Sequence, residues 1–128
     1  MNYSNEKYPL QKETYQIIGL CMEVHSILGL GLLEVVYKDA IEYELKLRNI
    51  PYEREKKYQV RYKDVTFQRY FNADFVVFDK IILEVKAQRE IADEHYKWVL
   101  NYMNLSKCKV GLIINFGKSS LEHKRLIL

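Results

Sequence analysis

Apolar positions recur at helical spacing through the first third of the chain. Steps of three and four residues predict one helix over residues 10–27 and a second over about 32–48. Gly29 and Gly31 lie between them and are expected to form the turn, because glycine readily ends helices. Asn49-Ile50-Pro51 follows the second helix and is expected to close it.

The pattern changes to that of strands in the middle of the chain. Tyr58, Val60 and Tyr62 alternate with polar residues, which predicts a half-exposed strand. Apolar stretches rich in β-branched and aromatic residues over 65–78 and 81–86 predict two further strands.

The last third of the chain alternates between the two patterns. Residues 91–105 have helical spacing, 109–116 suit a buried strand, and 121–128 suit a final edge strand. The order α-α-β-β-β-α-β-(β) predicts an α/β fold in which a mixed β-sheet is flanked by helices. We expect one domain over residues 1–128, with a flexible N-terminus over residues 1–9.

Three charged residues, Asp74, Glu84 and Lys86, interrupt two apolar strands. Burying a charge is costly unless it is paired or binds a metal. Alternation along a strand puts Glu84 and Lys86 on one face with Ile82. If the connecting loop has an odd number of residues, such as 78–80, Asp74 lies directly opposite Glu84 on that face. A two-residue loop would send Asp74 to the other face.

Two carboxylates and a lysine on one sheet face suit metal-assisted phosphodiester hydrolysis. Carboxylate oxygens are ligands that Mg²⁺ prefers, and the ion keeps coordination positions for water and phosphate. The ion lowers the pKa of a bound water, and a neighbouring lysine can orient that water or contact the phosphate. From spacing alone, the alternative is a structural ion pair in which Lys86 only neutralises Glu84 or Asp74.

This spacing resembles the core of the PD-(D/E)XK nuclease superfamily, in which an acidic residue ends one strand and Glu-x-Lys lies on the next. Residues 31–37, Gly-Leu-Leu-Glu-Val-Val-Tyr, are similar to the GxxExxY pattern that names a small family within it. Residues 24–31, Asn101-Tyr102-Met103 and the Gly-Leu-Ile-Ile-Asn-Phe segment at 111–116 resemble that family as well. The resemblance extends over about residues 15–127 and implies a PD-(D/E)XK nuclease-like core.

The resemblance also implies roles for individual residues. It suggests a nuclease that depends on Mg²⁺ or Mn²⁺ and acts on nucleic acid, with DNA favoured over RNA. Asp74 and Glu84 are expected to bind the ion, joined by the backbone carbonyl of Val85. Glu34 is expected to bind the ion or one of its waters, and Lys86 to position and activate the attacking water.

Four further residues are candidates for contacts with substrate, and each has a structural alternative. A lone histidine near a turn, such as His25, is commonly a hydrogen-bonded structural residue. Aromatic residues at helical spacing, such as Tyr37 and Tyr102, are commonly part of the core. Gln88, just past Lys86, equally suits an exposed surface.

One position departs from the superfamily pattern. The superfamily often carries a glutamine on the helix after Glu-x-Lys, four residues before a tyrosine. Tyr102 is present here, but Trp98 occupies the glutamine position. Side chains four apart share a helix face, so Trp98 and Tyr102 are expected to stack. The alternative function is a catalytically weak or inactive nuclease-fold protein that binds nucleic acid or another protein.

Composition adds few constraints. The 128 residues are 48% hydrophobic, and no apolar run approaches the roughly 18 residues of a membrane span. No signal-peptide pattern is present, so we expect a cytoplasmic protein with no membrane partner. The net charge of +3 permits a nucleic-acid partner without identifying one, and a homodimer or a protein partner is left open. Cys21 and Cys108 are expected to be core residues.

Overall fold

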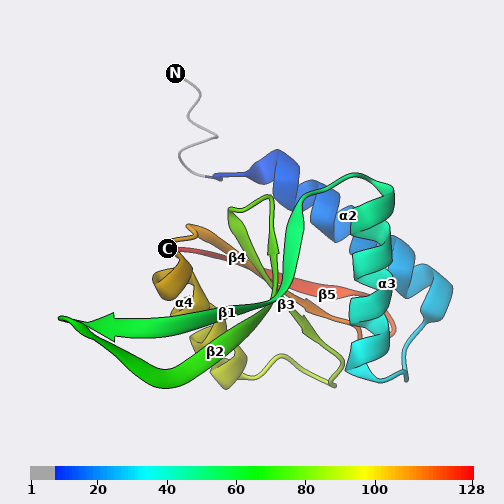
Figure 1. Ribbon diagram of the computed structural model, residues 1–128. Helices are drawn as coiled ribbons and strands as arrows, with labels where there is room; N and C mark the ends of the chain where they lie inside the picture. The colour runs from blue at the N-terminus through cyan, green and yellow to red at the C-terminus, as the bar shows by residue number, and fades with distance from the viewer. Residues whose placement is uncertain (1–7) are drawn as a thin grey trace.

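The structure, a computed structural model, describes residues 8–128. The expectation of a flexible N-terminus over residues 1–9 therefore falls mainly outside the described residues. The predicted order of helices and strands is confirmed (Figure 1). The elements are α2 (Gln11–Leu28), α3 (Glu34–Leu47), β1 (Tyr52–Tyr62), β2 (Val65–Val77), β3 (Ile81–Lys86), α4 (Asp93–Ser106), β4 (Val110–Asn115) and β5 (Glu122–Ile127).

The five strands form one mixed sheet in the order β1-β2-β3-β4-β5. Strands β3 and β4 are parallel, because α4 carries the chain back across one face of the sheet between them. All other neighbouring pairs are antiparallel. Strand β3, which carries the Glu-x-Lys residues, therefore lies at the centre of the sheet.

Helices cover both faces of the sheet, and each face has its own apolar cluster. Helices α2 and α3 pack on one face, where Phe75, Leu83 and Val85 belong to the same cluster as Ile17 and Tyr37. Helix α4 packs on the other face. The two faces share strand β3, whose first five residues are all buried.

Helix α4 lies very close to the sheet because of a glycine in β4. A Cβ on Gly111 would stand 2.6 Å from Val99 Cγ1 and 2.7 Å from Met103 Sδ, both on α4. A larger residue there would require the side chains of Val99 and Met103 to shift. This close approach brings Tyr102, one residue before Met103, against the centre of the sheet.

Strand β1 is longer than the sequence indicated. It begins at Tyr52, six residues before the predicted Tyr58, and pairs with β2 from Tyr52↔Val77 onward. Residues 53–57, Glu-Arg-Glu-Lys-Lys, have no apolar alternation to reveal a strand. They form one because the apolar end of β2 supplies hydrogen-bond partners, a long-range contact that local pattern does not report.

Two other predictions concern the two cysteines and the absence of a membrane-spanning segment. Both cysteines are buried and free, as expected of small core residues. Among the helices of residues 8–128, none is long and apolar enough to cross a bilayer.

Candidate active site

The loop between β2 and β3 fixes which charges face one another. Three residues separate the paired Val77 and Ile81, and the pairs Val76↔Ile82 and Phe75↔Leu83 follow. Continued by one step, this register sets Asp74 opposite Glu84. The loop thus has the odd number of residues that the site hypothesis requires.

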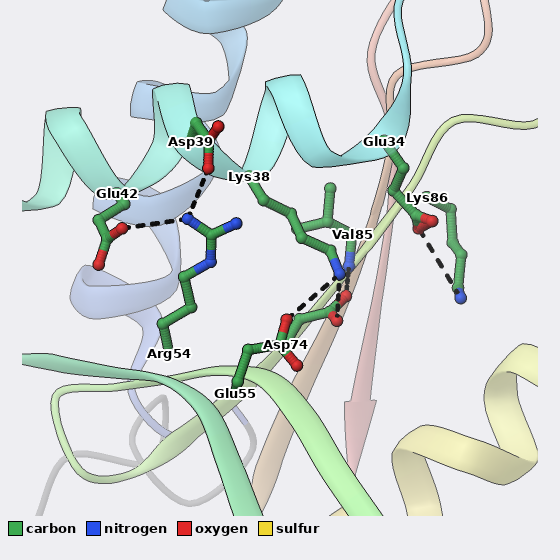
Figure 2. A network of polar contacts seen from close by, with 9 residues as sticks. All are labelled: Glu34, Lys38, Asp39, Glu42, Arg54, Glu55, Asp74, Val85 and Lys86. Carbon is green, nitrogen blue, oxygen red and sulfur yellow. Dashed lines mark hydrogen bonds and ion pairs between the residues drawn. The ribbon is translucent and has the colours of Figure 1, made fainter.

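Asp74 lies where the ladder between β2 and β3 ends. Its Oδ2 accepts a hydrogen bond from the Val85 backbone N–H at 2.8 Å. At this point a side-chain oxygen, instead of a backbone carbonyl, is the acceptor for β3. Its Oδ1 pairs with Lys38 Nζ of α3 at 2.8 Å, and the same ammonium lies 3.6 Å from Glu55 Oε1 of β1. Figure 2 shows Lys38 reaching down from the helix between these two carboxylates.

The side-chain alternation of β2 changes at Asp74. Ala73 belongs to the cluster under α4, whereas Phe75, two residues on, belongs to the cluster under α2 and α3. Residues two apart in a regular strand share a face, so the strand twists sharply here. Opposite this point, between the pairs Arg54↔Phe75 and Lys56↔Ala73, Glu55 has a left-handed backbone with φ 55°. At this irregularity Asp74 contacts the backbone of β3, and Glu55 lies close to Lys38.

Glu84 is the most strongly perturbed carboxyl of the site. Its side chain lies on the α4 face with Ile82, and the residue is only 5% exposed. Its Oε1 is buried without a hydrogen-bond partner in the described part of the chain. Burial, and then the neighbouring Asp74 carboxylate, raise the pKa of Glu84 to about 9, while the charge of Lys86 opposes this increase. Without a cation beside it, Glu84 therefore holds a proton at neutral pH.

Glu34 and Lys86 meet at the edge of this group. Glu34 is the first residue of α3, where a negative charge is favoured by the helix dipole. Its Oε1 lies 3.9 Å from Lys86 Nζ, too far for a hydrogen bond, and this buried oxygen has no other partner among residues 8–128 (Figure 2). Helix α3 thus contributes an acidic residue, Glu34, and a basic residue, Lys38, one helical turn apart.

Lys38 was missed by the sequence analysis, as was Glu55. Burial disfavours the charge of Lys38, but the hydrogen bond and attraction from Asp74 outweigh this effect and raise its pKa. The spacing Glu34-Lys38 was visible as a helical i, i+4 pair, yet such pairs are frequent on exposed helix surfaces. Only the packing of α3 over the end of β2 distinguishes this lysine from the others.

Tyr102 approaches the carboxylates from α4. It is 6% exposed, and burial raises its pKa, helped by the negative charges of Glu84 and Asp74. The ring centroids of Trp98 and Tyr102 lie 6.2 Å apart at 31°, so the expected contact between them is present. Trp98 itself remains 45% exposed.

His25 and Tyr37 lie in the structural network around the glycine turn. Tyr37 is fully buried; its hydroxyl donates to Gly29 O at 2.7 Å and accepts from Leu32 N at 3.2 Å. His25 Nε2 lies 2.8 Å from Lys118 O. Both rings stack on Phe116, at 4.4 Å for Tyr37 and 5.9 Å for His25. These contacts match the structural alternative for both residues, because the polar atoms are engaged away from the carboxylates.

Gln88 is held through its backbone by the strand beside β3. Asn115 Oδ1 accepts from Gln88 N at 2.9 Å, and Asn115 Nδ2 donates to Gln88 O at 2.8 Å. Gly117 fits against the same peptide, since a Cβ there would lie 2.1 Å from Gln88 O. The Asn-Phe-Gly segment at the end of β4 (residues 115–117) thus fixes the chain just beyond Lys86.

The donor set fits a hard divalent cation in chemistry. Two buried carboxylate oxygens, Glu84 Oε1 and Glu34 Oε1, have no hydrogen-bond partner in residues 8–128, and such oxygens are what Mg²⁺ and Mn²⁺ bind. The carboxylates do not form a ready cluster: no three His, Cys, Asp or Glu side chains of the described residues are grouped closely enough to hold a metal ion. Asp74 Oδ1 is already paired with the ammonium of Lys38.

Comparison with known proteins decides the family. A family model described as the PD-(D/E)XK nuclease superfamily matches residues 11–126, which is nearly the whole chain. This chain belongs to the PD-(D/E)XK nuclease superfamily. No match was found among curated proteins.

A solved structure shares the fold of this superfamily member. The structure titled "Crystal structure of SSO0001" aligns with a TM-score of 0.58 and 16% sequence identity over 98% of this chain. The chain spans only 59% of the length of that protein. The likeness therefore concerns the fold, which is the mixed α/β arrangement described above. The matching family model is described as that of a nuclease superfamily.

Proposed function

We propose that this protein is a metal-dependent nuclease that hydrolyses phosphodiester bonds of nucleic acid, with DNA as its expected substrate, and that it belongs to the GxxExxY family. The observation that carries the proposal is the state of Glu84. A carboxyl with a pKa of about 9 and an unpartnered buried oxygen lies beside Asp74 and shares a strand face with Lys86. Burying an ionisable carboxyl without a partner costs free energy, and a bound cation would offset that cost.

Asp74, Glu84 and the Val85 carbonyl would hold Mg²⁺ or Mn²⁺, with Glu34 binding the ion or one of its waters. When bound, the ion lowers the pKa of water and stabilises the charge that develops on phosphorus. The chain itself supplies the rest. The Val85 N–H orients Asp74, and Lys86, beside Glu34, positions and activates the attacking water. Lys38 neutralises Asp74 and Glu55 and keeps these carboxylates in place.

The test is cleavage of a panel of DNA and RNA substrates with Mn²⁺ or with EDTA. We expect Lys86→Ala to lower the rate by about two to four orders of magnitude, the size usual for lost general-base help. Lys80→Ala is the matched control, because Lys80 is an exposed lysine at the turn before the same strand. Equal rates for wild type and Lys86→Ala would refute the assignment.

A second candidate function rests on Lys38 and Trp98. Both oxygens of Asp74 are already engaged, by Lys38 and by Val85 N–H, and a half-exposed tryptophan replaces the usual glutamine. These features favour a nuclease fold that binds nucleic acid or a protein without cleaving. Binding that needs no metal and is unchanged by Asp74→Ala, together with no cleavage of any substrate, would support this candidate over the first.

A further inference from the structure

The outer halves of β1 and β2, residues 56–71, form a two-stranded ribbon that we name the arm. Figure 1 shows its tip projecting well away from the helices. Every residue from 61 to 70 is exposed, and β2 is exposed over its first six residues. The outer part of the arm, residues 61–70, therefore does not serve to build the core.

The arm carries the positive charge of the protein. Residues 56–71 contain five Lys or Arg and one Asp, a net charge of +4. Because the whole chain has a net charge of +3, all the other residues together sum to −1. A charge so concentrated on one exposed ribbon favours a polyanionic partner.

The arm also exposes aromatic rings. Tyr62, Phe67 and Tyr70 are 49%, 47% and 52% exposed. Tyr62 and Phe67 are in edge contact at 6.3 Å, and Lys57 Nζ lies 4.1 Å from the centre of the Tyr70 ring. The rings are thus kept beside cations on the surface, where stacking on a flat partner remains open to them.

The base of the arm connects to the candidate active site by two routes. Strand β1 passes from Glu55, which contacts Lys38, directly into the arm. At a rise of about 3.3 Å per residue, the eight steps from Glu55 to Lys63 span about 26 Å. The second route is a row of rings: Phe71 lies 5.7 Å from Trp98, which lies 6.2 Å from Tyr102 beside Glu84.

A hollow opens along this row of rings. It has a volume of about 320 Å³ and is lined by Phe71, Trp98 and the polar side chains of Glu94, Lys97 and Asn101. An exposed indole at the edge of such a hollow offers a ring face to a flat, unpaired base.

We propose that the arm binds a single-stranded segment of nucleic acid and leads it along Phe71 and Trp98 to the carboxylates. This deepens the function proposed above and rests on it for the delivery to a cleavage site. Lys57, Arg61 and Arg69 contact phosphates, and the rings stack on unpaired bases. A second copy of the chain is disfavoured as the occupant, because two arms would bring ten cations together.

The test measures binding of a fluorescent oligothymidylate, and of its duplex, by anisotropy in EDTA at several salt concentrations. The arm variant is Lys57→Ala with Arg61→Ala and Arg69→Ala. The control is Lys12→Ala with Lys46→Ala and Lys124→Ala, which removes the same charge from exposed positions on α2, α3 and β5.

We expect the arm variant to bind the single strand at least about tenfold more weakly, with a salt slope lower by about 2, since each lost phosphate contact removes about 0.7. The control should stay within about twofold of wild type. A Tyr62→Ala, Tyr70→Ala variant should weaken single-strand binding by about tenfold and duplex binding less, because only unpaired bases can stack. Equal affinities for the arm variant and the control would overturn the proposal, as would tighter binding of duplex than of single strand.

Cleavage assays on the same variants separate this inference from the proposed function. If wild type cleaves in a metal- and Lys86-dependent way while the arm variant binds normally, the arm proposal fails and the nuclease stands. If arm-dependent binding is present but no substrate is cleaved, the nuclease fails and the arm as a binding element stands. Loss of self-association in the arm variant, with nucleic-acid binding unchanged, would also overturn the arm proposal in favour of a dimer interface.

Discussion

The site end of the sheet (Glu34, Lys38, Glu55, Asp74, Glu84 and Lys86) and the arm carry similar charged side chains in opposite surroundings. Asp74 and Glu84 are 8% and 5% exposed; Asp74 pairs with Lys38, and burial together with the Asp74 carboxylate raises the pKa of Glu84. Lys57, Arg61 and Arg69 are all exposed. Charges at the site end are therefore coupled to the free energy of folding, whereas the exposed charges in the arm contribute little to it.

The largest expected effect concerns the loop that follows the site strand. Gly117→Ala would bring a Cβ to 2.1 Å from Gln88 O and 2.4 Å from Gln88 N, both backbone atoms with little freedom to move. We expect the free energy of unfolding in urea to fall by about 3 kcal/mol. Gly19→Ala in α2 meets nothing within 4 Å and should stabilise by up to about 1 kcal/mol, because alanine favours helix more than glycine does. Similar effects for the two substitutions would contradict the packing described for this loop.

Lys38→Met tests the role of the Lys38 ammonium at the candidate site. Removing the ammonium leaves Asp74 unneutralised beside Glu84, so we expect a loss of about 2 kcal/mol of stability in EDTA. The same variant frees Asp74 Oδ1, so Mn²⁺ should bind more tightly and restore stability by mass action. Lys46→Met, on an exposed position of the same helix, is the control. Calorimetric titration that shows weaker Mn²⁺ binding to Lys38→Met would mean that Lys38 supports the metal site instead of competing with it.

Glu84→Gln tests whether the raised pKa of Glu84 makes the stability of the fold depend on pH. The folded-state pKa of Glu84, about 9, lies above its ordinary value of 4.5. Between these values the folded protein binds more protons than the unfolded chain, so the stability of wild type should fall as pH rises from about 5 to 9. The glutamine amide cannot ionise, so we expect the variant to lack this decrease and to be more stable at pH 8 by on the order of 2 kcal/mol. Urea unfolding across this pH range in EDTA provides the measurement, and parallel curves for the two proteins would contradict the assigned pKa.

The smallest expected effect on folding belongs to the arm. The variant Lys57→Ala, Arg61→Ala, Arg69→Ala should change the free energy of unfolding by no more than about 0.5 kcal/mol, because exposed side chains away from packed features contribute little to stability. Its phenotype should be confined to nucleic-acid binding and its salt dependence. A large loss of stability in this variant would remove the distinction between the arm and the site end.

The sequence predicted the elements well where periodicity is strong. Both N-terminal helices, strand β3, helix α4 and the two last strands were expected within a few residues of their bounds. The helices repeat apolar positions at helical spacing, and β3 and β4 are short apolar runs rich in β-branched residues. The early part of β1 was missed because a run of charged residues has no such period. Asp74 and Glu84 could be proposed from the sequence because a charge inside an apolar strand is visible without knowledge of the fold.

Three decisive features arise only in the tertiary structure. Lys38 joins the site because α3 packs over the end of β2, and Glu84 acquires its raised pKa because neighbouring elements exclude water from it. The arm becomes a separate basic surface because β1 and β2 extend beyond the helices. Sequence encodes local period and residue type, and these predicted most of the strands and the candidate carboxylate pair. Desolvation and contacts between distant elements depend on the assembled chain, so they alone decided which charges are coupled to folding and which face solvent.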